Sequence, residues 1–557
     1  MTFSEHFLRL LPRRPWPALA ALYWHLTRRK LRARIRLRVA SADLPFAYKL
    51  WIASNERNHE LRQHLDARVK GWAWQPSFSV VLHDSAGSTK EQFERSTQSV
   101  ESQIYPHRSW TDAAPESLGA AVHAVEADYV VPLRIGDILS EAALYRLAEK
   151  LQDNPEAAVI YGDEDRLDTR ARRGNPWFKP QWNQEFFYAQ DYLSSAVAIE
   201  ASLAKRAAVR SGDSLAALLL DATAAADGPI VHVPHILTHV GVRNSFPPNR
   251  AALVARHLEA KGAKCAPGRF GTVKVEWPLP DELPLVSMII PTKDKLELLR
   301  PCVESLLKRT DYPNFEILVV DNQSVEKRTA DFLREIDKHP KVRVLPYHAP
   351  FNYSAINNFA ARSARGSYLC LLNNDTEVVE ACWLSELMRY AVRPDIGAAG
   401  AKLLYEDRTI QHAGVVIGIG EAAGHVHRFL PADQPGYFHQ AHIAQFISAV
   451  TGACLVIAKD KFDAVGGLDE KGLAVAFNDV DLCLRLEQAG WRNVYVPHAV
   501  LLHHESKSRG NDMAARNVAR YRRELQLLQD RWGTKTYQDP LHNPNLDRYS
   551  ETCVIKL

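Results

Sequence analysis

Val286-Ser287-Met288-Ile289-Ile290 is an apolar run of β-strand composition, and the polar turn Pro291-Thr292-Lys293-Asp294 follows it directly. Two further runs have the same form: residues 315–320 end in Asp321-Asn322, and residues 368–372 end in Asn373-Asn374-Asp375. Helical patterns lie between them at 296–308, 327–338 and 357–364, so the three strands are predicted to be parallel, with right-handed crossovers. Ligands of open α/β sheets bind beyond the carboxyl ends of the strands. The sequence therefore predicts one crevice that receives polar groups from three strands.

A second acidic stretch, Phe477-Asn478-Asp479-Val480-Asp481, opens a helical pattern that ends near Gln488. Charge beside an apolar run costs several kcal/mol unless a metal, a partner or a reaction uses it. This cost makes Asp375 and Asp479 candidates for chemistry. The structural alternatives are an Asx turn at Asp375 and a helix cap at Asp479.

A chain of 557 residues exceeds what one hydrophobic core usually supports, so more than one domain is expected. We divide it into a basic, aromatic-rich helical segment at 1–75, an α/β domain at 76–250, a second α/β domain at 284–535 and a tail at 536–557. Proline and glycine punctuation between 250 and 285 marks the boundary between the two domains.

The N-terminal segment carries a strong positive charge: residues 1–40 hold ten Arg or Lys and one acid, Glu5. Aromatic and leucine side chains alternate with these cations, which is typical of a segment that lies on an anionic membrane surface. The alternative is a helical extension with solvated arginines. No apolar run approaches the roughly 20 residues of a spanning helix, so we expect a cytoplasmic protein. If the N-terminal segment lies on a membrane surface, the protein is apposed to the inner face of the cytoplasmic membrane. A nucleic-acid partner is not expected, because the rest of the chain is acidic.

In their order and spacing these motifs resemble the family 2 nucleotide-sugar glycosyltransferases of the GT-A fold, and in particular the tandem bacterial members of the rhamnosyltransferase type. The resemblance is strong over 284–510 and weaker over 76–245. Further segments that carry it are Phe351-Asn352-Tyr353-Ser354, Thr451-Gly452-Ala453-Cys454, Gly466-Gly467-Leu468-Asp469-Glu470 and His503-His504-Glu505-Ser506. The implied fold is α/β, with two tandem Rossmann-like GT-A domains of which the first is degenerate.

The resemblance implies a site for a nucleotide-diphosphate donor. Asp321 resembles the residue that grips the base or ribose, and Pro291 and Thr292 would flank the base. Asn357 stands where many relatives have a basic residue. Lys507 and Arg509, in a loop with Gly510, would contact the diphosphate.

The resemblance also implies a metal site and a catalytic base. Asp375 resembles the last residue of the family's D-x-D motif, whose first position is Asn373 here, and it would hold Mn²⁺ or Mg²⁺. His503 or His504 would complete the shell, with a slight preference for His504. Asp479 resembles the base that deprotonates an acceptor hydroxyl in a single inverting displacement, and Asp481 would orient that base.

Residues 76–245 look like a damaged copy of the same unit. Arg134-Ile135-Gly136-Asp137 stands where D-x-D belongs, and the sequence shows no strand that ends in a nucleotide-binding Asp. We expect this copy to be catalytically silent, unless Asp163, Glu164 and Asp165 provide a site of their own.

Taken together, the resemblance predicts a metal-dependent inverting glycosyltransferase. It would move a sugar from a dTDP- or UDP-sugar to a hydroxyl of a surface polysaccharide, O-antigen or lipopolysaccharide acceptor. The alternative is a non-catalytic glycan-binding or scaffold subunit of a polysaccharide assembly complex, because Asn373 and Asn478 each replace a family acid. The sugar, the linkage and the oligomeric state stay open at this point.

Overall fold

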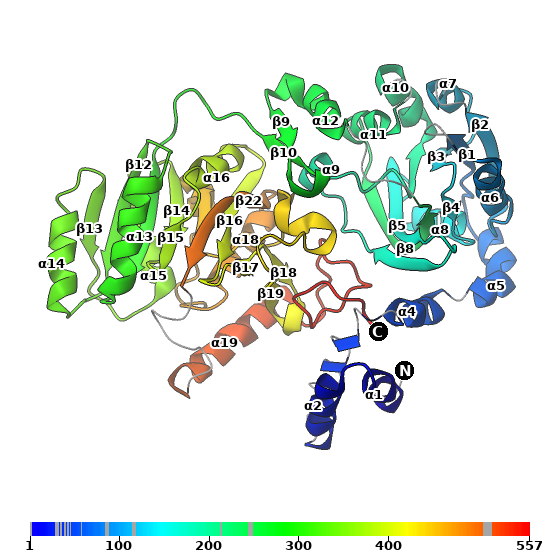
Figure 1. Ribbon diagram of the computed structural model, residues 1–557. Coiled ribbons are helices and arrows are strands. Elements are labelled where there is room, and N and C mark those ends of the chain that lie inside the picture. Colours follow the sequence, from blue (N-terminus) through cyan, green and yellow to red (C-terminus); the bar gives the residue numbers. More distant parts are fainter. Residues whose placement is uncertain are drawn as a thin grey trace.

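The computed structural model describes the chain except for residues 1–2, 28–32, 34–35, 38–39, 42–43, 45, 57, 84–87, 114–117, 212–213, 243–248 and 505–514. Two mixed sheets form the body of an α/β protein, side by side in Figure 1. A helical N-terminal segment precedes them, with helices α1 (Phe3–Leu10), α2 (Pro15–Leu26), α4 (Ala47–Asn55) and α5 (Asn58–Lys70). The predicted α/β class is confirmed.

The C-terminal sheet has the strand order β13-β12-β11-β14-β21-β16-β22-β15, with β17 beside β16 and β20 beside β22. β11 pairs in parallel with both β12 and β14, so the prediction of three neighbouring parallel strands is confirmed. The strands are β11 (Val286–Thr292), β12 (Phe315–Asp321), β13 (Val342–Pro346), β14 (Tyr368–Leu372), β15 (Thr376–Val378), β16 (Ile396–Leu404), β17 (Ile410–His412), β20 (Gln445–Phe446), β21 (Cys454–Ala458) and β22 (Arg492–His503). A separate hairpin joins β18 (Val415–Ile417) to β19 (Ala423–His425).

Helices connect these strands as the crossover rule requires. α13 follows β11, α14 follows β12, and α15 lies between β13 and β14. The helices of this domain are α13 (Leu296–Arg309), α14 (Lys327–Ile336), α15 (Tyr353–Ser363), α16 (Trp383–Ala391), α17 (Lys459–Ala464), α18 (Asn478–Gln488) and α19 (Ala515–Trp532). Every residue of β11 is buried, because helices cover both faces of a parallel sheet. Its one serine, Ser287, donates to Glu316 Oε1 at 2.7 Å.

The N-terminal sheet repeats this plan. Its order is β2-β1-β3-β7-β5-β8-β4, which matches β12-β11-β14-β21-β16-β22-β15 strand for strand, and the parallel and antiparallel pairings agree as well. The strands are β1 (Phe78–His83), β2 (Arg108–Ala113), β3 (Tyr129–Arg134), β4 (Ile138–Leu139), β5 (Val159–Leu167), β6 (Arg173–Trp177), β7 (Val197–Glu200) and β8 (Ile230–Val240). The helices are α6 (Lys90–Glu101), α7 (Leu118–His123), α8 (Ala143–Asp153), α9 (Gln184–Ala189), α10 (Ala201–Ser211), α11 (Leu215–Ala224) and α12 (Arg250–Leu258). The two sheets are copies of one topology.

One expectation about the first copy is wrong: the strand thought to be missing is present as β2. Arg108 pairs with Phe78 as Phe315 pairs with Val286, so β2 occupies the place of β12. Its sequence, RSWTDA, is an exposed or half-buried edge without an apolar run, which hid it from pattern reading. β2 ends at Ala113, one residue before the position that Asp321 holds in β12.

The acidic run of the first copy is structural. Asp163 accepts from His232 Nε2 at 2.8 Å, and Glu164 forms a buried ion pair with Lys179 Nζ at 2.9 Å. Asp165 accepts from Arg173 Nε at 2.6 Å. All three carboxylates are at most 2% exposed and engaged by these partners.

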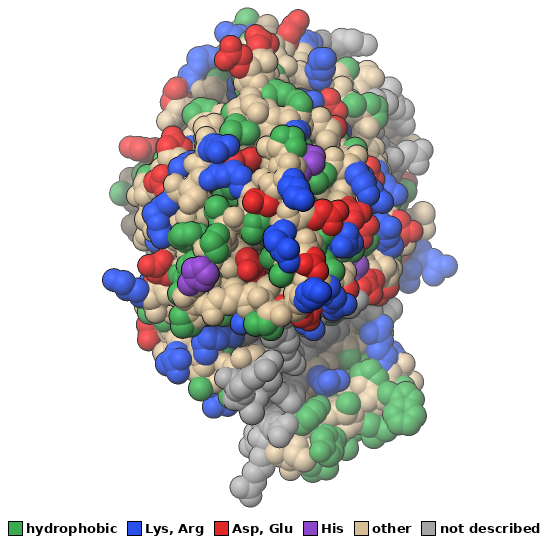
Figure 2. Space-filling model, turned by 90° about the vertical axis from the view of Figure 1, so that its left-hand side faces the viewer, with side chains coloured by type: hydrophobic (Ala, Val, Ile, Leu, Met, Phe, Trp, Pro, Cys, Tyr) green, Lys and Arg blue, Asp and Glu red, His purple; other side chains and the backbone are tan. Residues whose placement is uncertain are grey.

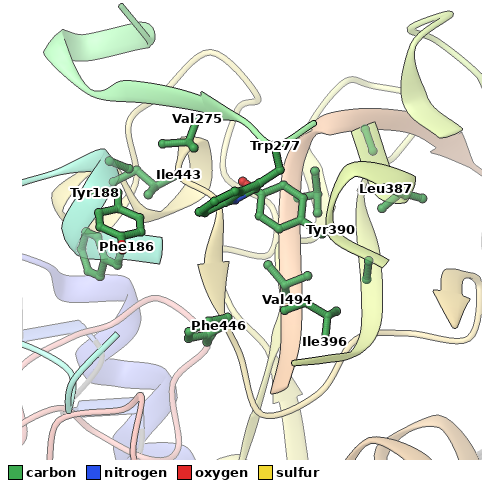
Figure 3. Packing of buried hydrophobic residues seen from close by; sticks show 14 of the residues in the cluster. Phe186, Tyr188, Val275, Trp277, Leu387, Tyr390, Ile396, Ile443, Phe446 and Val494 are labelled. Carbon is green, nitrogen blue, oxygen red and sulfur yellow. The ribbon is translucent and has the colours of Figure 1, made fainter. Parts of the chain in front are cut away.

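Trp277 joins the two domains, and the hairpin β9 (Lys264–Pro267) and β10 (Val273–Glu276) leads to it. Figure 3 shows Trp277 with Phe186 and Tyr188 of α9 on one side and Tyr390 of α16 on the other. Its indole Nε1 donates to Glu185 at 3.1 Å. Arg393 donates to the same carboxylate at 2.6 Å and stacks on the indole, with its guanidinium 4.3 Å from the ring centre.

The C-terminal tail contacts both domains. Asn543 Nδ2 donates to Asp163 Oδ2 at 3.0 Å and to the Lys179 carbonyl at 2.8 Å, in the first domain. Asp539 Oδ2 accepts from Ile417 N at 2.7 Å, in the second domain. The tail therefore fastens one domain to the other.

The first prediction concerns the Glu185–Arg393 pair. Arg393→Met should lower the free energy of unfolding by about 3–5 kcal/mol, because it leaves the carboxylate of Glu185, which is 1% exposed, without its cation. Urea unfolding followed by circular dichroism measures this. The control is Arg334→Met, which removes an exposed ion pair with Asp331 and should change stability by about 0.5 kcal/mol at most. Equal effects of the two substitutions would contradict the role of Arg393.

Candidate active site

A cavity of about 1030 Å³ opens at the carboxyl ends of β11 and β14. The end of β12, the β18–β19 hairpin and the first turns of α15, α18 and α19 complete its wall. Its polar and charged lining residues are Thr292, Lys293, Asp294, Lys295, Asn322, Glu326, Tyr353, Asn373, Asn374, Asp375, Gln411, His425, Arg428, Thr451, Asn478, Asp479, His503, Asn517, Arg520 and Tyr521. The predicted convergence of three strand ends on one crevice is thus present in the structure.

Hydrogen bonds tie the three strand ends together. Asn374 Nδ2 donates to Thr292 Oγ1 at 3.0 Å, and Asn322 N donates to the Thr292 carbonyl at 2.8 Å. Asp294, in the left-handed region at φ +53°, accepts from the amides of Val325 and Glu326 at 2.8 Å each. The loops after β11 and β12 are held as one wall.

Asp375 and His503 face each other in this cavity. Asp375 follows β14, and His503 is the last residue of β22, where it pairs with Thr376 of β15. His503 Nε2 lies 3.1 Å from Asp375 Oδ1, and both residues are buried. The other ring nitrogen, Nδ1, lies 2.6 Å from Gln411 Oε1. An amide oxygen accepts only, so the His503 ring donates from Nδ1 to Gln411, and Nε2 is the ring nitrogen that faces Asp375.

This pair fits a divalent cation. A metal-bound histidine usually donates its other N–H to a fixed acceptor, as His503 does to Gln411. Two ligands about 2.1 Å from a metal, on adjacent octahedral corners, lie about 3.0 Å apart, which agrees with the Asp375–His503 separation. Among the described residues no group of three or more His, Cys, Asp and Glu side chains gathers as a metal cluster.

The neighbouring His504 points elsewhere. Its Nδ1 lies 2.6 Å from Glu406 Oε1 and its Nε2 lies 3.8 Å from Glu377. Successive side chains of a strand project to opposite faces, so only one of the two histidines can face the cavity. The slight preference for His504 as the metal-binding histidine is therefore corrected: His503, not His504, faces Asp375.

His412, next to Gln411 on β17, contacts a residue of the cavity wall but does not line the cavity itself. Its Nδ1 lies 2.9 Å from Nδ1 of His425, a residue that lines the cavity. Burial lowers the pKa of His412 well below its usual value, and the nearby His425 and His503 lower it further. The His412 imidazole is therefore neutral, and it adds no positive charge beside His503.

Asp479 lies half-buried in the first turn of α18. Its Oδ2 accepts from Gly452 N and its Oδ1 from Val480 N, both at 2.9 Å. The preceding Phe477, at φ +61°, turns the chain sharply into the helix and packs its ring against Tyr521 of α19. A carboxylate has about four acceptor directions, so Asp479 keeps capacity for a substrate hydroxyl.

Tyr353 connects the surroundings of the two acidic residues. Its hydroxyl donates to the carbonyl of Gly452 at 2.9 Å and lies 3.2 Å from Asn373 Oδ1. Asn373 Nδ2 in turn lies 3.1 Å from His503 Nε2. The Tyr353 hydroxyl thus links the loop that contacts Asp479 to Asn373, which lies beside Asp375.

The structure does not bring Asp481 to the cavity. Its side chain is fully buried and accepts from Arg485 Nε at 2.9 Å, Arg531 Nη1 at 2.7 Å and Trp532 Nε1 at 3.0 Å. These contacts fasten α19 to α18. Two residues along a helix turn the side chain by about 200°, so Asp479 and Asp481 face opposite sides.

Of the other residues predicted to bind the donor, some line the cavity and some do not. Pro291 and Thr292 line the cavity. Asp321 does not, although the next residue, Asn322, does; its carboxylate accepts from Ser324 N at 3.1 Å. Asn357 is fully buried within α15 and donates to the Tyr353 carbonyl at 2.8 Å. Lys507 and Arg509 lie outside the described residues.

Sequence reasoning missed Gln411, Arg428, Arg520 and Tyr521. Tyr521 shares a helical stripe with Leu528, which is fully buried, but Tyr521 itself lines the cavity. The spacing of these residues does not distinguish Tyr521 from the buried members of the stripe. Gln411 gave no signal, because it lies in a strand of only three residues, Ile410–His412, outside the motifs that carry the resemblance.

The sequence profile described as "Glycosyl transferase family 2" matches residues 287–428, from β11 to the β19 end of the cavity wall. The chain carries a family 2 glycosyltransferase domain. This confirms the family that the motifs resembled. The matched segment contains Pro291, Thr292, Asp375 and Gln411.

Beyond this family 2 domain, the chain is similar to larger proteins. It is 41% identical over 452 residues to "Uncharacterized protein y4gI" of Sinorhizobium fredii, covering 77% of this chain and 50% of the relative. It is 35% identical over 459 residues to "O-antigen biosynthesis protein RfbC" of Myxococcus xanthus, covering 78% of this chain and 35% of that protein. The chain thus spans half or less of these two curated relatives.

A third relative is smaller. The "N-acetylglucosaminyl-diphospho-decaprenol L-rhamnosyltransferase" of Mycobacterium tuberculosis is 27% identical over 281 residues, which cover 45% of this chain and 85% of the relative. Two solved structures align at a TM-score of 0.35 and 16% identity: the mannosyltransferase PcManGT of Pyrobaculum calidifontis with GDP-Man and Mn²⁺, and GalNAc-T7 with UDP, GalNAc and Mn²⁺. Each covers 48% of this chain, and 70% and 60% of those chains are matched.

The second prediction separates the two aspartates of α18 in the family 2 domain. Asp481→Asn should lower the free energy of unfolding by about 2–3 kcal/mol, because it removes the charge that two arginines share inside the protein. Asp479→Asn, at a half-buried position, should cost about 1 kcal/mol or less. Thermal unfolding of both variants measures the difference. A larger loss in Asp479→Asn would overturn the structural role given to Asp481.

Proposed function

We propose that the C-terminal domain transfers a sugar from a nucleotide-diphosphate donor, a dTDP- or UDP-sugar, to a hydroxyl of a surface polysaccharide, O-antigen or lipopolysaccharide acceptor. The reaction is metal-dependent and inverts the anomeric configuration. The observation that carries this proposal is the single cavity lined by Asp375 with His503 and by Asp479. The names of the Myxococcus and Mycobacterium relatives support the acceptor class.

The donor nucleotide lies against the ends of β11 and β12. Pro291 gives an apolar contact for a base, and Thr292 and Asn322 give polar ones. Lys293 and Lys295 add positive charge at the same wall, which suits a diphosphate. The hydrogen bonds between these loops keep this surface fixed when the donor binds.

Asp375 and His503 are the residues that would hold a divalent cation, and the cation would supply positive charge beside the leaving diphosphate. Asp375 supplies a carboxylate oxygen and His503 supplies Nε2, held toward the cavity by Gln411. A mixed oxygen and nitrogen set favours Mn²⁺ over Mg²⁺.

Asp479 acts as the general base. Two backbone amides fix the orientation of its carboxylate, and it takes the proton from the acceptor hydroxyl while that oxygen attacks the anomeric carbon. The diphosphate leaves from the opposite face, so one displacement inverts the configuration. Asp481 plays no chemical part in this proposal, because it is enclosed by Arg485, Arg531 and Trp532.

The first domain is a scaffold in this proposal. By strand register Arg134 and Gly136 take the places of Asn373 and Asp375, so no carboxylate stands where the metal would be held. Its acidic residues Asp163, Glu164 and Asp165 serve buried contacts instead.

The third prediction tests the metal and the donor together. Calorimetric titration of UDP and dTDP should give binding that strengthens with Mn²⁺ in the wild type, with the metal-dependent part lost in Asp375→Ala and weakened about 10–100-fold in His503→Ala. His504→Ala is the matched control and should bind as the wild type does. Weakening in His504→Ala but not in His503→Ala would refute the assignment of the histidines. A folded wild type that binds oligosaccharide and no nucleotide would favour the non-catalytic scaffold.

The fourth prediction tests the base. Asp479→Asn should keep nucleotide binding and lower kcat for sugar transfer about 10²–10⁴-fold, because the acceptor proton then has no base to receive it. Transfer is followed as nucleotide release in the presence of acceptor glycan. A variant with normal kcat would remove Asp479 from the mechanism and leave the donor site untouched.

A further inference from the structure

Large apolar side chains stand exposed on the first two helices. Of the twelve exposed large hydrophobic residues among those described, five fall in α1 and α2: Leu8, Trp16, Leu19, Tyr23 and Leu26. Trp16 is 81% exposed and Leu26 is 72% exposed. The four in α2 follow each other at intervals of three or four residues, so they form one stripe along the helix. We call these five residues the N-terminal stripe.

The opposite face of α2 is already packed. Ala18 and Ala21 are fully buried and contact Leu10 of α1 and Leu37. The small side chains therefore lie inside and the large ones outside, which is the reverse of a helix that folds onto a core in water. Such an exposed apolar surface marks an interaction site.

The sequence around the stripe is rich in positive charge. Arg9 and Arg13 are exposed on α1 and on the turn after it, and Glu5 is the single acid of the first 40 residues. Seven further Lys or Arg follow α2 in the sequence between residues 28 and 38. Tryptophan and tyrosine favour the boundary between water and lipid, and arginine favours anionic headgroups.

We propose that α1 and α2 bind flat to an anionic lipid bilayer, with the N-terminal stripe inserted among the acyl chains. α2 has 12 residues, a length of about 18 Å, which is less than the roughly 30 Å of a hydrocarbon core. No described helix is long and apolar enough to span a membrane. The clustered cations distinguish a lipid surface from a second copy of the chain, whose own stripe would carry the same charge.

The position of these helices suits an acceptor held in a membrane. In Figure 1, α1 and α2 project from the side of the molecule where the β18–β19 hairpin and α19 lie, and both of these elements line the cavity. Figure 2 shows hydrophobic side chains at the bottom of the turned molecule, at the level of the same helices. This link to a lipid-borne acceptor rests on the proposed function, whereas the binding of the bilayer does not.

Vesicle flotation tests the proposal with the full-length protein. The wild type should float with vesicles of phosphatidylcholine and phosphatidylglycerol, and should bind at least about tenfold more weakly to phosphatidylcholine alone or at 1 M salt. Leu19→Ser/Leu26→Ser should weaken binding to the anionic vesicles by about tenfold or more. Arg9→Glu/Arg13→Glu should remove the preference for the anionic lipid.

The matched control is Val209→Ser/Val242→Ser, which removes two valines that are 75% and 64% exposed elsewhere on the surface. It should bind vesicles as the wild type does, and circular dichroism should show every variant folded. A wild type that stays with the aqueous fraction, or a stripe variant that floats equally well, would overturn the proposal. So would a wild-type dimer in light scattering that Leu19→Ser/Leu26→Ser converts to a monomer. Loss of nucleotide binding in the site variants, with flotation intact, would refute the proposed function alone.

Discussion

The parallel register of β11 with β12 and β14 is the constraint on which the site depends. Continuous backbone pairing fixes the point at which each strand ends, so Thr292, Asn322 and Asn374 meet at one edge and close hydrogen bonds with each other. A slip of one residue in this register would turn every side chain to the other face. Asp375 would then leave His503, and the cavity would lose its charged wall.

The duplicated sheet shows how little of this chemistry belongs to the backbone. Both copies have the same strand order and the same pairing directions, yet Arg134 and Gly136 of the first copy stand where the second has Asn373 and Asp375. Asp163 and Asp165 of the first copy lie in the interior, where they bind partners from other segments. Glu185 of the first domain contacts Trp277 and Arg393, and these contacts hold the first domain against the second.

The sequence pattern revealed the apolar runs and the polar groups at their ends, because the buried residues of β11 and β14 are consecutive in the sequence. It slightly favoured His504 over His503, because the sequence does not show which face β22 presents to Asp375. It placed Asp481 with Asp479 because two residues are close in sequence, although a helix separates them by half a turn. Gln411 and Tyr353 act through partners about 20 to 100 residues away, and no local pattern contains such contacts.

The contact of Asn543 with Asp163 bears on the order in which the molecule is completed on the ribosome. Domains generally fold as they emerge, the N-terminal one first. Yet Asp163, which is fully buried, receives an amide from a residue made 380 positions later. The contacts of Asn543 with Asp163 and with the Lys179 carbonyl can therefore form only after nearly the whole chain has been synthesised. Until then Asp163 has only its partners within the first domain, such as His232.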